Sequence, residues 1–258
     1  EKCAKIDAII DQQQDVIEKL KAYKLSTITE AVTKGIDLDV QMKDSGIEYI
    51  GEVPKNWQII KMARIIENTQ NGLTRRDLSD SKGEIVLKLK NITANGQIDF
   101  TEVNRIELSE NEKLQYQLSD NDFLFVRVNG SKSLVGKCAI YQGQNEIIAF
   151  NDHIIRVKLS NDCQKKYVHW FLQSESGRRG IELLINTAAG QFTISGQGLR
   201  EIRITSPPLS EQKNISEYLS NKTIKVESVI ERKEILIDNL TKYKKSLIYE
   251  VVTGKKEV

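Results

Sequence analysis

One helix-like segment occurs near both ends of the chain, and this internal repeat limits the folds that the chain can adopt. Residues 6–33 read IDAIIDQQQDVIEKLKAYKLSTITEAVT, and residues 226–253 read VESVIERKEILIDNLTKYKKSLIYEVVT. A shift of 220 residues aligns the two copies, and both end in Val-Thr. One copy alone would indicate an ordinary amphipathic helix, whereas a match over a whole helix length indicates a duplicated element. The identical pairs include Ile10 with Ile230, Ile17 with Ile237, Leu20 with Leu240 and Tyr23 with Tyr243.

Both copies predict a long amphipathic helix, because apolar residues recur at spacings of three and four on a stripe close to a heptad seam. Gln13 and Lys233 interrupt this stripe, and such polar positions can fix the register of paired helices. A helix of about 30 residues is ~45 Å long and cannot bury a narrow stripe by itself. The two copies are therefore expected to pair as a coiled coil. The stripe comprises Ile6, Ile9, Ile10, Val16, Ile17 and Leu20 in the first copy, and Val226, Val229, Ile230, Leu236, Ile237 and Leu240 in the second.

Between the copies, the pattern changes from loop to strand. Residues 36–56 are loop-like, with Gly46, Gly51 and Pro54 as breaks. From Trp57 onward, short apolar or alternating runs predict strands, and Ser210 stands where the N-cap of a closing helix is expected. The sequence thus predicts a first helical copy over 1–35, a linker over 36–56, a mixed α/β globule over 57–209 and a second helical copy over 210–258. Strands are expected at 84–90, 122–128, 134–141, 146–150, 153–159 and 199–205, and helices at 167–173 and 181–185.

Composition excludes several classes of protein. No run of about 18 apolar residues predicts a membrane span, and the first residues do not resemble a signal peptide. Cys3, Cys138 and Cys163 are odd in number and widely spaced, which favours free thiols in a reducing cytoplasm over a disulfide framework. The absence of an initiator Met suggests a fragment of a longer chain. A net charge of +2 means that nucleic-acid binding would depend on local patches.

Motifs for catalysis are missing from the sequence. The Pro-Pro of Ser206-Pro207-Pro208-Leu209 lacks the flanking residues with which an adenine methyltransferase holds a flipped base. No glycine-rich cofactor loop or Walker-type loop occurs, and no Pro-Asp precedes an acid-x-Lys as in metal-dependent nucleases. His153 and His169 have no zinc-ligand spacing with any cysteine, and His153 is interpreted as structural. We therefore expect no catalytic residue, no metal and no cofactor.

Three polar segments have the composition of DNA-reading loops. Bidentate amides and guanidinium groups read base edges, and basic or small polar side chains hold phosphates. The segments are 68–76 (NTQNGLTRR), 127–132 (RVNGSK, with Asn129-Gly130 as an expected tight turn) and 187–195 (TAAGQFTIS). Any one of them could be a solvated turn, but three on one globule favour nucleic acid as a partner. The candidate DNA-binding residues are Asn71, Thr74, Arg75, Arg76, Lys88, Lys90, Arg127, Asn129, Ser131, Lys132, Gln191 and Thr193, with Arg178 and Arg179 beside them.

Several sequence segments, in this order, resemble the specificity subunits of type I restriction-modification systems. Residues 45–57 (SGIEYIGEVPKNW) are similar to the entry into a recognition domain, and residues 122–127 (DFLFVR) with 134–137 (LVGK) are similar to its central strands. Residues 207–212 (PPLSEQ) and 250–255 (EVVTGK) resemble the beginning and end of the helix that follows. The resemblance implies an α+β fold: one mixed α/β target recognition domain flanked by two long conserved helices that pair as an antiparallel coiled coil. It also implies that Ile10, Ile17, Leu20, Tyr23, Ile230, Ile237, Leu240 and Tyr243 lie in the coiled coil or bind partners.

The resemblance further implies a function. In this family, two recognition domains each read half of a split double-stranded DNA target, and the helices set the spacer between the half-sites. The helices also dock methyltransferase subunits, and the complex recruits the restriction and motor subunit. This chain has one recognition domain, so it is either a fragment or a half-subunit that forms a homodimer. Two alternatives are a coiled-coil adaptor whose globule binds protein and a hydrolase that uses His153.

Overall fold

The computed structural model describes residues 2–37, 39–75, 82–93, 95–188 and 190–253. The chain divides into two compact units, and each is described by itself. Unit 1 comprises Glu1–Thr27 and Glu217–Val258, and unit 2 comprises Ile28–Ser216. The two longest helices, α1 (Lys2–Lys34) and α6 (Leu209–Val252), contribute residues to both units.

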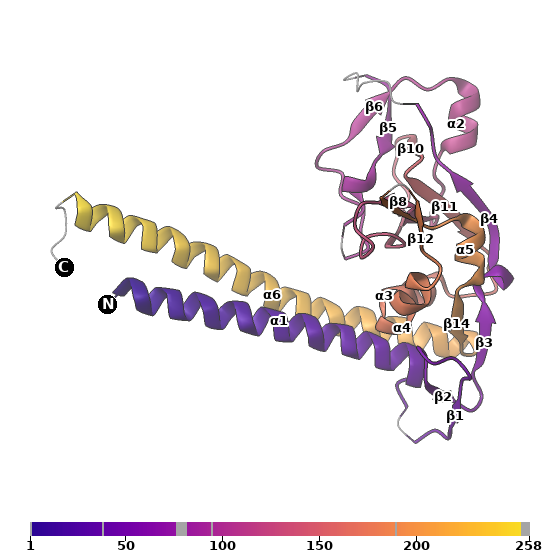
Figure 1. Cartoon of the computed structure of the whole chain (residues 1–258), viewed down its shortest axis with the longest axis horizontal. Coiled ribbons are helices and arrows are strands. Elements are labelled where there is room, and N and C mark those ends of the chain that lie inside the picture. The colour runs from indigo at the N-terminus through magenta and orange to yellow at the C-terminus, as the bar shows by residue number, and fades with distance from the viewer. Residues whose placement is uncertain (1, 38, 76–81, 94, 189, 254–258) are drawn as a thin grey trace. The chain divides into compact units, whose positions relative to one another are not determined.

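Unit 1 is built from the two copies of the repeat, which lie side by side in it (Figure 1). Along both helices, one series of buried or half-buried residues recurs at alternating steps of three and four, which is the spacing of a heptad seam. The seam positions of the second helix are those of the first shifted by the repeat length. They are Cys3, Ile6, Ile10, Gln13, Ile17, Leu20, Lys24 and Thr27 in α1, and Thr223, Val226, Ile230, Lys233, Ile237, Leu240, Lys244 and Leu247 in α6.

Polar contacts between the helices give their relative direction. Lys244 Nζ lies 2.5 Å from an Asp7 carboxylate oxygen, and Lys24 Nζ lies 2.5 Å from a Glu227 carboxylate oxygen. Lys233 Nζ donates a hydrogen bond of 2.7 Å to Gln13 Oε1. Residue numbers rise along one helix as they fall along the other, so the helices run antiparallel in unit 1.

The buried stripe is narrower than the sequence predicts. Ile9, Val229 and Leu236 were expected in it but are exposed, because a straight seam of two residues per heptad leaves the third apolar position outside. Tyr23 and Tyr243 are 48% and 55% exposed, so they also lie outside the seam. A role for these two tyrosines in partner binding stays a prediction.

The described residues of unit 2 form five small β-sheets rather than one large one. The first has the order β4 (Ile66–Asn71), β11 (Ile154–Leu159), β7 (Phe123–Val126) and β9 (Cys138–Ile140), all antiparallel, and the second has the order β10 (Ile148–Phe150), β5 (Glu84–Leu87) and β6 (Asn104–Ile106). The third consists of β12 (Asn186–Ala188), β13 (Gln191–Thr193) and β8 (Val128–Asn129). The two-stranded pairs are β1 (Met42–Asp44) with β2 (Glu52–Pro54), and β14 (Arg203–Ser206) with β3 (Gln58–Lys61).

Short helices join and cover these sheets in unit 2. Phe123, Leu124, Phe125 and Val126 of β7 are all buried, which explains why this strand reads as a continuous apolar run. Leu124 and Val126 pack in a core with residues of β5, β10 and β11. The helices are η1 (Met62–Arg64), η2 (Leu89–Asn91), α2 (Glu110–Tyr116), α3 (Lys165–Gln173), α4 (Glu175–Glu182) and α5 (Gly196–Glu201).

The last turn of α1 is part of unit 2 and is fixed by hydrogen bonds. The carbonyl oxygen of Val32 accepts bonds from Thr205 Oγ1 at 2.7 Å and from Tyr167 Oη at 3.2 Å. Gly35 follows the helix with φ of +82°, the conformation that commonly ends a helix at glycine. These bonds satisfy a carbonyl that the end of the helix leaves without an intrahelical partner.

Several predicted elements differ in the structure. The strand expected over 199–205 is split into the end of α5 and β14, because Ser195 Oγ accepts a bond from Gly198 N and starts a helix there. The helix expected at 181–185 ends at Glu182 instead, and the closing helix begins at Leu209, one residue before the expected cap. The polar segment over 68–76 begins as strand, because 68–71 pairs with β11. Linker residues 42–44 and 52–54 form the hairpin β1–β2.

Candidate nucleic-acid interface

Backbone hydrogen bonds bring the first and second predicted loops to one junction in unit 2. Leu73 N donates to Phe150 O at 2.9 Å, and Asp152 N donates to Leu73 O at 2.8 Å. Arg127 N donates to His153 O at 2.8 Å, and Arg127 Nη1 donates to Asp152 O at 2.9 Å. The turn at 151–153 therefore lies between Thr74, in the first loop, and the start of the second loop.

The third predicted loop joins the second through a β-sheet. Thr193 pairs with Val128 and Phe192 pairs with Asn129, and Ile194 N donates to Arg127 O at 3.0 Å. Residues 186–188 and 191–193 thus pair as antiparallel strands and are not an irregular loop, and Gly190 has a φ of +77°. The Asn129-Gly130 pair was expected to make a tight hairpin turn and does not. Its Asn129 belongs to β8, and Gly130 lacks the positive φ that such a turn requires.

The two candidate lysines near 90 have different surroundings. Lys88 follows β5 directly, and Asn151 N donates to Leu87 O at 3.0 Å. Because β5 and β10 are parallel, Lys88 emerges at the same junction as the loops. Lys90 Nζ instead lies 2.9 Å from a Glu102 carboxylate oxygen, an exposed ion pair within its own segment.

Exposure separates the candidates that can meet a ligand from those that support the loops. Thr193, Asn129 and Lys88 are half-buried, and Asn129 Oδ1 accepts a bond from Ser131 N. Arg76 lies outside the residues that the structure describes. The exposed candidates are Asn71, Thr74, Arg75, Ser131, Lys132 and Gln191, together with the ion-paired Lys90.

Two arginines of this region donate hydrogen bonds to main-chain carbonyl oxygens and thereby hold the loops in place. The Arg127 guanidinium bonds Asp152 O, as described above. Arg178 donates to Val135 O at 2.5 Å and to Lys132 O at 2.7 Å, and its Nε lies 2.9 Å from a Glu182 oxygen. Arg178 thus fixes the segment after Lys132. Arg75 is also partnered, since its Nη1 lies 3.3 Å from Glu112 Oε1.

Sequence reasoning missed the glycine that allows the junction to form. A Cβ atom at Gly72 would lie 2.3 Å from the carbonyl oxygens of both Phe150 and Asn151, which is too close for any side chain. Gly72 therefore permits the first loop to approach β10. The sequence of the loop did contain a sign of this close approach, because a glycine follows a strand-like run. The residues that Gly72 approaches, however, lie almost 80 residues further along the chain.

A buried charged pair supports the sheet below the junction. Arg156 of β11 donates to Gln117 O at 2.9 Å and to the side chain of Gln70, and its Nε lies 4.0 Å from Asp122 Oδ2. Burial raises the pKa of Asp122 and lowers the pKa of Arg156, because loss of hydration disfavours both charged forms. Neither group faces a ligand site, so we assign both to the structure of the sheet.

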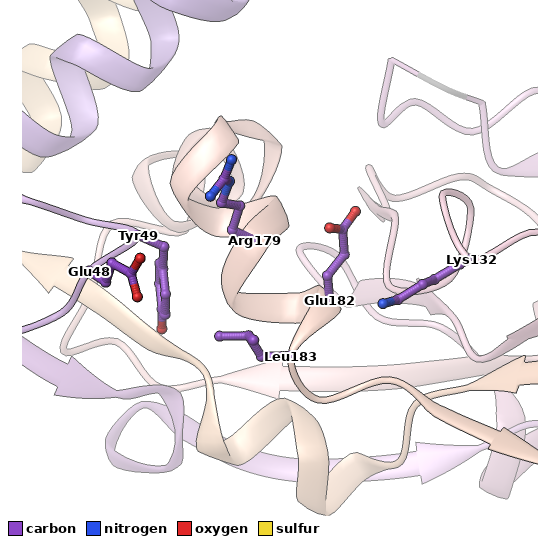
Figure 2. A pocket seen from close by; sticks show the side chains of 6 residues that line it. All are labelled: Glu48, Tyr49, Lys132, Arg179, Glu182 and Leu183. Atoms are coloured by element: carbon purple, nitrogen blue, oxygen red, sulfur yellow. The ribbon is translucent and has the colours of Figure 1, made fainter.

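A pocket of about 340 Å³ lies next to the second loop, lined by Glu48, Tyr49, Lys132, Arg179, Glu182 and Leu183. Figure 2 shows Tyr49 and Leu183 within it, with Lys132 extending from its loop toward α4. Burial raises the pKa of Tyr49, which keeps its phenol neutral. Two acidic and two basic side chains share the lining, so the pocket does not favour a ligand of one charge.

Groups suited to catalysis are not assembled in the described residues. His153 Nε2 lies 4.0 Å from Asp152 Oδ1, too far for a hydrogen bond between a base and its orienting acid. The pKa of His169 is lowered to about 4 by burial, and that of the Cys138 thiol is raised to about 12 for the same reason. No group of three or more His, Cys, Asp or Glu side chains in the described ranges could hold a metal ion. No described helix is long and apolar enough to cross a membrane.

Comparison with known proteins identifies the family. The pattern of the family described as "Type I restriction modification DNA specificity domain" matches residues 54–236, which is more than half of the chain. Along the chain, a mixed α/β unit lies between two long helices, and within that unit three polar segments meet at one junction. The chain belongs to the type I restriction-modification DNA specificity family.

Curated relatives carry the same description. The chain is 31% identical over 152 residues to the type I restriction enzyme EcoKI specificity subunit of Escherichia coli, covering 58% of this chain and 32% of that protein. It is 27% identical over 206 residues to the putative type I restriction enzyme MjaX specificity subunit of Methanocaldococcus jannaschii, covering 79% and 47%. The chain therefore spans about a third to a half of the length of these relatives.

Solved structures share the fold. The HsdS subunit from Thermoanaerobacter tengcongensis is similar with a TM-score of 0.57 at 10% identity, covering 96% of this chain and 56% of that one. A chain from a structure of a type I R-M system is similar with a TM-score of 0.61 at 12% identity, covering 96% and 57%. At such low identity, these similarities concern the fold alone.

Proposed function

We propose that this chain is a DNA specificity subunit, or part of one, of a type I restriction-modification enzyme. Its recognition domain, over 57–209, reads part of a split double-stranded DNA target and carries out no catalysis. The observation that carries the proposal is the meeting of three polar loops and Lys88 at the turn 151–153. Family membership and the lack of an assembled catalytic group in the described residues support it.

The side chains of this junction suit different parts of DNA. Gln191 and Asn71 are exposed amides, which can bond an adenine edge in a bidentate manner. Lys132 and Lys88 carry the charge that phosphate oxygens bind, and Thr74 and Ser131 can add neutral donors. Arg178 and Arg127 hold the loops in place. We therefore assign base reading to the amides and backbone contacts to the lysines.

Binding to a DNA library at graded salt tests this assignment. We expect Lys132→Ala to weaken binding to all sequences alike and to reduce the salt slope by about one, because one phosphate contact is lost. Gln191→Ala should instead lose about 1–3 kcal/mol of discrimination at one or two positions of the target. The measurement is competitive binding followed by sequencing of the bound DNA.

The matched control is Lys55→Ala, an exposed lysine of the same unit near the β1–β2 hairpin, which should bind DNA as the unaltered chain does. Equal losses for Lys132→Ala and Lys55→Ala would show that only the overall charge matters. Binding that lacks any sequence preference in the unaltered chain would refute the proposed reading function.

We propose that the two long helices form an antiparallel coiled coil that sets the spacer between half-sites. The alternating burial of the two copies supports this, as do the contacts of Lys233 with Gln13, of Lys24 with Glu227 and of Lys244 with Asp7. The same helices would dock methyltransferase subunits and, through the complex, the restriction and motor subunit. Exposed apolar residues on α6 are available for such contacts, among them Tyr243, Ile235 and Tyr249.

A second recognition domain would complete the split target. In the first repeat copy, Ile28 and Val32 are 2% and 0% exposed within unit 2, whereas the aligned Ile248 and Val252 of the second copy are 45% and 79% exposed. We propose that residues 248–253 receive a second recognition domain, as the end of α1 receives the first. That domain belongs either to a longer chain or to a second copy in a homodimer.

A coiled-coil adaptor is the second candidate, and the exposed apolar residues of α6 favour it. It predicts tight protein binding that does not depend on DNA.

The 4.0 Å separation of His153 from Asp152 argues against the hydrolase alternative. The three free thiols support a reducing, cytoplasmic location.

A further inference from the structure

The contacts between the two helices of unit 1 are related by a local two-fold axis. The repeat shift carries Asp7 onto Glu227 and Lys24 onto Lys244. The ion pairs Lys24–Glu227 and Lys244–Asp7 are therefore two copies of one contact, each joining the same two repeat positions. Antiparallel pairing of two equivalent helices produces this arrangement, with an axis that passes between them.

The hydrogen bond from Lys233 to Gln13 lies on that axis. The repeat shift carries Gln13 onto Lys233, so this contact joins one repeat position to its own counterpart. Both residues are half-buried, and apolar seam residues flank them on each side, namely Ile10 and Ile17 in α1 and Ile230 and Ile237 in α6. The axis therefore brings two polar residues of the seam face to face.

The same seam geometry is available to any two copies of the repeat. When α1 pairs with α6, the axial contact is Gln with Lys, which form a hydrogen bond. If α6 paired with α6 of a second molecule, the axis would bring Lys233 against the partner's Lys233. Two ammonium groups at a half-buried seam repel each other and have no acceptor between them, whereas the flanking Ile layers would be as apolar as before.

We propose that the axial pair Gln13–Lys233 selects the partner of each helix. Lys233 prevents α6 from pairing with α6 of a second copy of this chain, and Gln13 makes α1 the helix that accepts it. A single polar seam residue is known to fix register and partner choice in coiled coils at the expense of stability. This inference rests on the coiled coil proposed above and concerns a different part of the chain from the DNA-reading loops.

A charge exchange across the axis tests the pairing in the full chain. Gln13→Lys places two lysines on the axis and should lower the Tm of the helices by several degrees, on the order of 5 °C. The exchanged variant Q13K/K233Q restores one amide and one lysine and should recover the Tm of the unaltered chain. The measurement is thermal unfolding followed by circular dichroism at 222 nm. Failure of the exchange to restore the Tm would overturn the axial contact.

Self-association tests partner choice. Lys233→Ile removes the charge from the axis and should strengthen dimerisation on the order of tenfold or more, as measured by sedimentation equilibrium. The matched control is Lys225→Ile, which adds the same apolar surface at an exposed position of α6 outside the seam. Dimerisation of K233I no stronger than that of K225I would overturn the proposed role of Lys233.

Binding of DNA by the same variants keeps the two proposals separate. Changes at positions 13 and 233 should leave the sequence preference of the recognition domain unchanged. An unaltered chain with no sequence preference would count against the proposed function and not against the axial pair. A restored Tm in Q13K/K233Q would then still support the pairing of α1 with α6.

Discussion

At the scale of single residues, the two histidines of the chain have different environments. His153 is half-buried beside the junction of the loops, whereas the ring of His169 lies among Phe123, Cys138 and Gln173. The Nε2 atom of His169 lies 2.7 Å from the Gln173 amide nitrogen. This ring nitrogen can accept a hydrogen bond from the amide only when the imidazole is neutral. Loss of hydration lowers the pKa of His169 to about 4.

The lowered pKa predicts how stability depends on pH. The unfolded chain binds a proton at position 169 near pH 6.5, but the folded chain does so only near pH 4, so stability is lost as the pH falls through this window. Between pH 7 and pH 4.5 the loss from this residue should be about 2–3 kcal/mol. His169→Gln should remove that part of the loss in urea unfolding at the two pH values. His153→Gln is the control, and an equal effect of both changes would contradict the assignment.

At the scale of elements, the carbonyl oxygen of Val32 connects three parts of unit 2. It belongs to the last turn of α1 and accepts bonds from Tyr167 of α3 and Thr205 of β14. Tyr167 Oη also lies 2.7 Å from Thr205 Oγ1, and both side chains are buried. Burial raises the pKa of Tyr167, so the phenol keeps its proton and stays a donor.

The shared carbonyl predicts non-additive effects of mutation. Tyr167→Phe should cost about 1 kcal/mol of unfolding free energy, because Thr205 still donates to the carbonyl. The double variant Y167F/T205V leaves a buried carbonyl unpaired, and we expect about 1–3 kcal/mol beyond the sum of the single changes. Urea unfolding of the four proteins gives the coupling. Simple additivity would mean that each hydroxyl acts alone.

At the scale of the whole molecule, the two copies of one repeat have different surroundings. The end of the first copy is buried in unit 2, and the end of the second copy is exposed, although the two segments have similar sequences. The side chains of Val32 and Val252 are aligned by the repeat and differ only in what covers them. This difference supports the proposal that a second recognition domain binds the end of α6.

Matched substitutions at the aligned valines test this difference. Val32→Asp places an unpaired charge in the core and should cost several kcal/mol, enough to unfold unit 2. Val252→Asp should change the unfolding free energy by less than about 0.5 kcal/mol, because the side chain is exposed. Chemical unfolding measures both. Stability lost equally at the two sites would show that residue 252 is already buried in solution.

The sequence alone determined the elements that depend on periodic or local patterns. The heptad spacing and the apolar run of β7 follow from residues that lie close together in the chain. The duplicated helix follows from comparing the sequence with itself, so all three could be recognised without a structure. The three polar segments were recognised from their composition for the same reason, although each of them contains strand residues that the sequence did not indicate. The helix of α5 was missed because its cap, Ser195, lies just before a segment whose apolar residues alternate.

Only the tertiary structure decided which of these elements meet. The pairing of β8 with β13, and of Leu73 with the turn at 151–153, joins segments more than 60 residues apart, and no local pattern encodes such partners. The structure likewise showed that Arg178, which the sequence placed beside the candidate DNA-binding residues, holds the segment after Lys132, because its guanidinium bonds carbonyl oxygens, which every sequence supplies. It also distinguished the two repeat copies, since burial depends on what packs against a residue and not on the residue itself.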